Sequence, residues 1–257
     1  MAFTILTAII GVLIGLLAGL CSGMFGIGGG IVAVPMMRII LLMPGIMAVG
    51  TSIFMVIPTA LSGALVYARK KKIDVFTGAV CGLAGIPTVV LGAFAGNFIA
   101  GNTLMLMFSV LPIITGVKLL QKKRGLQASG RQKGKKHILL SLGIGAFAGF
   151  LSGLFGIGGG VLLVPVFVML LDIEIHDAIG TSLMAIAIYG IPGAIAHALQ
   201  GNTNFAILVP LLAGAVVGPQ ISARICLRTK TDRMRIIFAI FMFFMGVYMA
   251  IRELGMI

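Results

Sequence analysis

Residues 23–35 read GMFGIGGGIVAVP, and residues 153–165 read GLFGIGGGVLLVP. The two stretches lie 130 residues apart, and over the longer windows 15–35 and 145–165 the chain is identical at 13 of 21 positions. Chance does not produce such a match, so the chain contains an internal duplication. Each copy joins a run of glycines to an apolar run that ends at a proline.

The duplication extends over most of the chain. The same offset, without a gap, relates Gly50-Thr51-Ser52 to Gly180-Thr181-Ser182 and Gly116 to Gly246. Residues 121–137 between the copies are rich in charge and turn residues, as in a linker. We therefore expect a first inverted repeat at 1–120, a basic cytoplasmic linker at 121–137 and a second inverted repeat at 138–257.

The composition predicts a membrane protein. Apolar residues make up 60% of the 257 residues and charged residues only 10%, whereas an ordinary soluble domain carries about 25% charged residues. Uncharged runs such as Met1 to Met37 and Val75 to Val117 are each long enough for one or two spans. The first run lacks the cationic start of a secretory signal, so we interpret it as a span. The lipid bilayer is the expected surrounding.

Five apolar segments per repeat are expected to be helices, because none shows the alternation of a membrane barrel strand. The fold class is thus an all-α polytopic membrane protein of two inverted repeats, with a broken or re-entrant helix at each Gly-rich motif. In the first repeat the segments are roughly Ala2 to Ser22, Gly28 to Met43, Ile46 to Ala68, Val75 to Ile99 and Thr103 to Leu120.

The basic residues indicate how the chain lies in the membrane. The net charge is +13, and 17 of the 19 basic residues fall in three clusters, at Arg69 to Lys72, Lys118 to Lys136 and Arg224 to Arg235. Such clusters fit the enrichment of Lys and Arg in cytoplasmic loops better than they fit nucleic-acid binding. No nucleic-acid partner is expected.

Equivalent loops of the two repeats carry opposite charge bias. Residues 69–72 read RKKK while 199–202 read LQGN, and 97–103 are uncharged while 227–233 hold three basic residues. Equivalent loops then lie on opposite sides, which makes the repeats inverted and the number of spans per repeat odd. Five plus five crossings, or three plus three with re-entrant hairpins, both satisfy the charges, with both termini outside.

The glycine run predicts a break in the helix, because each glycine costs about 1 kcal/mol relative to alanine. A helix that starts after such a break offers free N–H groups and a positive dipole end, which suit an anion. In inverted-repeat transporters such half-helix ends meet at the substrate site. Close helix packing is the alternative and is favoured for Gly19 and Gly23. The candidate substrate-binding glycines are Gly26, Gly28, Gly29, Gly30, Gly156, Gly158, Gly159 and Gly160.

The paired motifs, each followed by Gly-Thr-Ser about 20 residues later, resemble the TauE/SafE family of sulfite exporters. The resemblance covers nearly the whole chain. It implies a transporter of a small sulfur-containing anion, sulfite or an organosulfonate, in the bacterial cytoplasmic (inner) membrane. Which anion is carried, and in which direction, does not follow from it.

Hydroxyl groups supply further candidates for anion binding. Thr51, Ser52, Thr181 and Ser182 interrupt apolar runs at equivalent positions, although such residues also bond back to their own helix. Asn97, Asn204 and Gln220 are weaker candidates, near segment ends or unmatched across the offset.

The acidic residues bear on what drives transport. No acidic residue falls in the middle of a predicted span, so a carboxylate proton relay is poorly supported. Export driven by membrane potential is the hypothesis that remains.

Other function classes are weighed on the same residues. The chain lacks the motifs of metalloproteases and serine hydrolases, so an enzyme is not expected. Neither a cofactor nor a metal is expected, because Cys21, Cys81 and Cys226 are widely spaced. An anion channel and a structural membrane subunit stay open as alternatives to a secondary transporter. A homo-oligomer is also left open.

Overall fold

The computed structural model describes residues 5–99 and 134–253, with scattered positions between 103 and 117, and every regular element there is an α-helix. The first half contains α1 (Ile5–Phe25), α2 (Gly30–Ile40), α3 (Gly45–Arg69) and α4 (Val75–Gly96). The second half contains α6 (Lys135–Phe155), α7 (Gly160–Leu170), α8 (Ile175–Leu199), α9 (Phe205–Arg228) and α10 (Thr231–Glu253).

The helix boundaries repeat with the 130-residue offset of the sequence. The first three helices of each half start and end at equivalent residues, and α4 and α9 start at equivalent residues. Six of the described helices, α1, α3, α4, α6, α8 and α9, are long and apolar enough to cross a membrane. The expected all-α polytopic membrane fold is confirmed. Most of the fifth segment of the first half and residues 121–133 of the linker lie outside the described residues.

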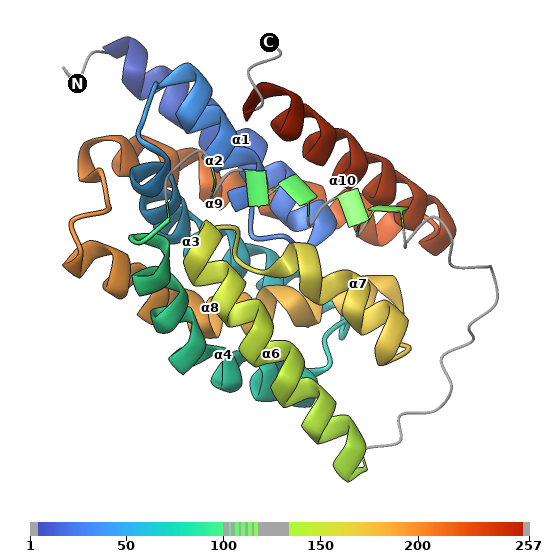
Figure 1. Ribbon diagram of the computed structural model, residues 1–257. Coiled ribbons are helices and arrows are strands. Elements are labelled where there is room, and N and C mark those ends of the chain that lie inside the picture. Colours follow the sequence, from blue (N-terminus) through green and yellow to red (C-terminus); the bar gives the residue numbers. More distant parts are fainter. Residues whose placement is uncertain are drawn as a thin grey trace.

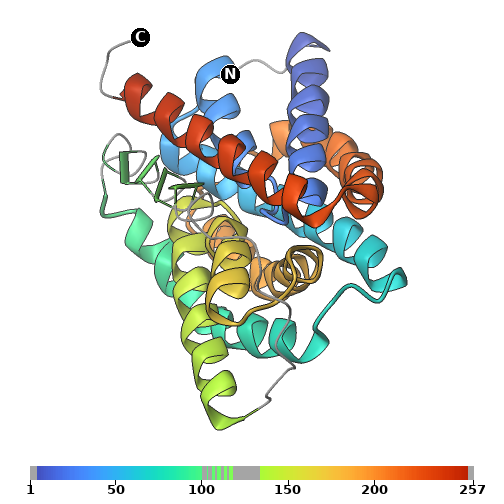
Figure 2. The same cartoon turned by 90° about the vertical axis from the view of Figure 1, so that its right-hand side faces the viewer.

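The helix break expected at each glycine motif is present. The chain leaves α1 at Phe25 and α6 at Phe155, and a new helix begins five residues later in each half. With 11 residues, α2 and α7 rise only about 16 Å, half the thickness of a hydrocarbon core. They are half-helices, and α2 turns back toward the end of the molecule where α1 begins (Figures 1 and 2).

The two halves are interleaved through their outer helices. Helix α1 packs against α9 of the other half, and α6 packs against α4 in the equivalent way. Figure 2 shows α1 running downward from its start and α6 running upward from its start. The equivalent first helices therefore run in opposite directions within the molecule.

Glycines make these helix contacts close. A Cβ atom at Gly15 would collide with the carbonyl group of Leu211, and one at Gly153 with the carbonyl group of Val89. Gly19 and Gly23 face Pro219 of α9 in the same contact. The packing role expected for Gly19 and Gly23 is confirmed, and the packing joins the two halves.

Candidate functional site

The two glycine motifs lie against each other at the contact between the halves. A Cβ atom at Gly30 would collide with the carbonyl oxygen of Gly156, and one at Gly160 with that of Gly26. Six motif glycines have positive φ angles between 66° and 85°, which residues other than glycine rarely adopt: Gly26, Gly28, Gly29, Gly156, Gly158 and Gly159. The candidate glycines of both halves are thus brought together.

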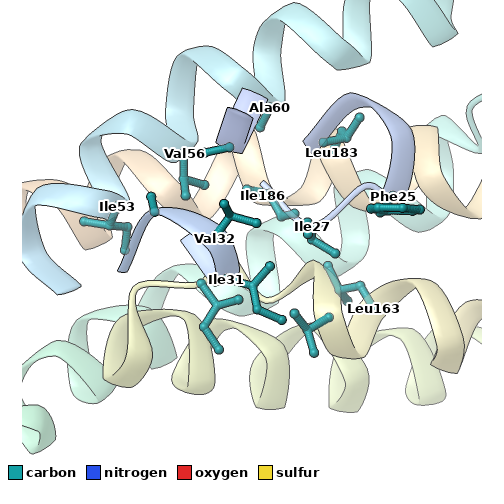
Figure 3. Close-up of a cluster of buried hydrophobic side chains, with 14 of the residues drawn as sticks. Phe25, Ile27, Ile31, Val32, Ile53, Val56, Ala60, Leu163, Leu183 and Ile186 are labelled. Carbon is teal, nitrogen blue, oxygen red and sulfur yellow. The ribbon is translucent and has the colours of Figure 1, made fainter. Parts of the chain in front are cut away.

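Apolar side chains surround the paired motifs. Val56 of α3 and Ile186 of α8 are fully buried, and a Cβ atom at Gly28 or at Gly158 would lie within 3.5 Å of both. Ile27 and Ile157, at equivalent positions, are also buried. Figure 3 shows Ile27, Val56 and Ile186 in one cluster. The side chains around the paired motifs are therefore buried in the protein interior.

The half-helices that start at the motifs have no side-chain cap. Gly29 precedes α2 and Gly159 precedes α7, and neither supplies a capping hydrogen bond. Asp74 caps α4 and Asn204 caps α9 with side-chain oxygen atoms, whereas α3, α6 and α8 lack a side-chain cap as α2 and α7 do. Because the first N–H groups of a helix lack partners within it, the starts of α2 and α7 present donors that their N-cap residues leave unsatisfied.

Two buried hydroxyls beside the motifs lack hydrogen-bond partners. Ser22 and Ser152 are fully buried at equivalent positions, and neither Oγ atom has a partner in the described part of the chain. Ser22 lies one turn after Ala18, whose carbonyl group faces Gly29. Buried hydroxyls are normally satisfied. Sequence analysis missed this pair, although the 130-residue offset aligns the two serines.

The Gly-Thr-Ser motifs fasten one half to the other. Ser52 Oγ donates to Gly156 O at 2.7 Å, and Ser182 Oγ donates to Gly26 O at 2.9 Å. Thr51 Oγ1 accepts from the backbone N–H of Asn204, and Thr181 Oγ1 accepts from that of Asp74. These four hydroxyls bond to the protein in this conformation, and their role in binding substrate stays a prediction.

Other side chains hold the motif carbonyl groups from within each half. Thr59 Oγ1 donates to Gly28 O at 2.7 Å, and Tyr189 Oη, at the equivalent position, donates to Gly158 O at 2.6 Å. In the same way Tyr67 Oη donates to Gly23 O at 2.9 Å, and His197 Nε2 lies 2.8 Å from Gly153 O. The motifs are therefore positioned by equivalent bonds in both halves, through residue types that differ between the copies.

The ends of the molecule differ in chemistry. Near the ends of α4 and α8, Asn97, Gln200 and Asn202 form an amide cluster in which Asn202 Nδ2 donates to Asn97 Oδ1 at 2.8 Å. The equivalent loop at the other end carries the basic residues of the first cluster. Within the described ranges, no three His, Cys, Asp or Glu side chains are grouped as they would be to hold a metal.

Comparison with known proteins places this chain among membrane transporters. The family model described as "Sulfite exporter TauE/SafE" matches residues 11–249. The chain belongs to the TauE/SafE family. This confirms the resemblance seen in the paired glycine motifs, and with the six apolar helices it makes the TauE/SafE chain a multi-pass membrane protein.

Relatives in the TauE/SafE family align with this chain over most of their length. "Probable membrane transporter protein YunE" of Bacillus subtilis (strain 168) is 28% identical over 245 residues, which cover 87% of this chain and 90% of the relative. "Probable membrane transporter protein MJ0441" of Methanocaldococcus jannaschii is 27% identical over 249 residues, covering 88% and 89%. No solved structure matches this chain.

Proposed function

We propose that this chain is a secondary transporter of a small sulfur-containing anion of the sulfite or organosulfonate class. It moves the anion across the bacterial cytoplasmic membrane by alternating access around the paired half-helix ends, with export as the direction. Family membership supports the transporter class and argues against an enzyme. The observation that carries the proposal is the pair of uncapped half-helix starts beside Ser22 and Ser152.

The chemistry of these groups suits a small oxyanion. Backbone N–H groups and hydroxyls donate hydrogen bonds without adding a full positive charge, and the N-terminal dipole ends of α2 and α7 favour negative charge. Anions held by neutral donors are released more readily than anions held by buried cations, because no ion pair has to be broken. Fast release is what a carrier needs.

The equivalence of the two halves supports alternating access. Equivalent serine and threonine bonds join each half to the other, so exchanging the conformations of the halves would open the centre toward the opposite end. Val56 and Ile186 occupy the centre when it is closed. We propose that their displacement accompanies opening to either side.

A flux screen in proteoliposomes tests the proposal. Purified protein is reconstituted and loaded separately with labelled sulfite, sulfate, thiosulfate and a short alkyl sulfonate. Saturable flux of sulfite or the sulfonate, lost in Gly28→Val and Gly158→Val but kept in Gly143→Val, would support it. A Cβ atom at Gly143 meets nothing within 4 Å, so that variant is the matched control. Equal flux in all three correctly folded variants would refute the site, and no flux of any sulfur anion would refute the function.

A channel for the same anions is the second candidate, because inverted repeats occur in both classes. Counter-transport separates them: an unlabelled anion on one side accelerates uptake of labelled anion through a carrier and does not through a channel. A structural subunit would support no flux at all.

A further inference from the structure

A basic cavity lies at the ends of α3 and α9, apart from the glycine motifs. Its volume is about 560 Å³, within the range of small-molecule sites. The lining consists of five basic and two apolar residues: Val66, Arg69, Lys70, Lys72, Arg224, Leu227 and Arg228. The positive charge of the cavity comes from both halves of the chain.

Four of the five cations around the cavity form no ion pair with the described part of the chain. Lys72 Nζ lies 2.9 Å from Glu174 Oε2 and 3.4 Å from Asp177 Oδ1. The hydrogen bond to Glu174 raises the pKa of Lys72 above its ordinary value, so this amine stays charged near neutral pH. For the other four cations, no carboxylate in the described part of the chain forms an ion pair. Like charges around one cavity repel each other, and a bound anion relieves that repulsion.

The cavity is separate from the paired motifs. On α3, Thr59 bonds Gly28 and Val66 lines the cavity; the two residues are seven positions apart, which is about 10 Å along the helix axis. One small anion cannot touch both Gly28 and the cavity. The cavity is nevertheless connected to the first motif, because Tyr67, next to Val66, bonds the Gly23 carbonyl group.

The basic residues of the cavity are not repeated at the equivalent positions of the other half. At the 130-residue offset, Arg69, Lys70 and Lys72 correspond to Leu199, Gln200 and Asn202, and Arg224 and Arg228 correspond to Phe94 and Phe98. Two of these counterparts, Gln200 and Asn202, belong to the amide cluster. A general need for cytoplasmic charge places basic residues in a loop but does not require them to surround a cavity.

We propose that this cavity is a second oxyanion site, which binds a free sulfur oxyanion or the phosphate group of an anionic lipid. The guanidinium groups of Arg69, Arg224 and Arg228 can each donate two parallel hydrogen bonds to two oxygen atoms of such an anion. The proposal concerns binding alone and does not rest on the transported substrate.

Sulfate binding to the full-length protein in detergent tests this site. Binding is measured by calorimetry at constant ionic strength, in the Ser22→Ala/Ser152→Ala background so that the motif site does not contribute. We expect Arg69→Gln/Arg228→Gln to weaken binding at least tenfold. Lys135→Gln/Lys136→Gln removes the same charge from exposed residues at the start of α6 and should change binding less than twofold.

The source of the anion is settled by repeating the titration in nanodiscs. Competition by cardiolipin against sulfate, lost in the arginine pair, would identify a lipid headgroup, and sulfate binding unaffected by cardiolipin would identify a free anion. Either result supports the site. Equal loss of sulfate binding in the two charge-neutralised pairs, or no binding of either probe, would overturn it.

Discussion

At the scale of single residues, Ser22 and Ser152 are expected to lower the stability of the ligand-free protein and to contribute to sulfite binding. A buried hydroxyl without a partner costs about 1–3 kcal/mol. Ser22→Ala should therefore raise the free energy of unfolding of the ligand-free protein by about 1 kcal/mol. It should also weaken the stabilisation that sulfite adds. Thermal unfolding in detergent, with and without sulfite, measures both effects.

The matched change for this prediction is Ser141→Ala on α6. Ser141 is buried, but its Oγ donates to His137 O at 2.8 Å, so its removal should lower stability and leave the sulfite effect intact. A Ser22→Ala protein that is less stable and still responds fully to sulfite would contradict the assignment.

The sequence predicts some of these residues and not others, for a physical reason. The glycine runs can be recognised in the sequence because several glycines close together disfavour a continuous helix. The hydrogen bond from Ser52 to Gly156 joins residues 104 apart in sequence, and nothing local marks it. Nothing local marks Tyr67 and His197 either: both are fully buried, and each contacts the carbonyl oxygen of a glycine 44 residues earlier in the chain.

At the scale of helices, the α1–α9 contact depends on the absence of side chains. Gly15→Ala would place a methyl group against the Leu211 carbonyl, which is backbone and cannot rotate away. We expect a loss of about 1–3 kcal/mol in unfolding free energy. Gly143→Ala has open space and should be neutral or slightly stabilising. Equal thermal midpoints for the two variants would show that the packing is looser than described.

The apolar residues at the centre are expected to limit transport. Val56→Ala with Ile186→Ala enlarges the space between the two motifs, so sulfite flux should rise at least twofold and discrimination against larger sulfonates should fall. Val89→Ala with Ile144→Ala removes the same groups from α4 and α6 and controls for lost stability. Slower flux in the central pair than in the control pair would argue against a gate at this position.

The helices themselves were largely predictable, whereas their partners were not. Apolar length and glycine breaks gave the segments, and the 130-residue offset gave their equivalence. The pairing of α1 with α9 and of α6 with α4 follows from glycine faces that match only in three dimensions. The basic cavity likewise combines two charge clusters that the sequence places more than 150 residues apart.

At the scale of the whole molecule, inversion predicts opposite exposure of equivalent loops. In a background with Cys21, Cys81 and Cys226 replaced by Ala, Lys71→Cys should react with a membrane-impermeant maleimide only from the cytoplasmic side. Leu199→Cys, at the end of α8, should react only from outside. Both positions are exposed in the structure. Labelling of both from one side would rule out the inverted topology.

The direction of transport proposed above bears on what drives it. An anion leaving a cell that is negative inside gains about 2.3 kcal/mol per charge per 100 mV. We therefore expect sulfite flux from proteoliposomes to follow an imposed potassium diffusion potential. Flux that requires a proton or sodium gradient and ignores the potential would contradict uncoupled export.

The number of sulfite ions bound at the paired motifs tests the central claim, that both halves form one anion site. Equilibrium binding of labelled sulfite is measured in the Arg69→Gln/Arg228→Gln background, which removes the second site. We predict one ion per chain, with an affinity that falls when either Ser22 or Ser152 is replaced by Ala. Two ions per chain, each lost with one serine, would contradict a shared site.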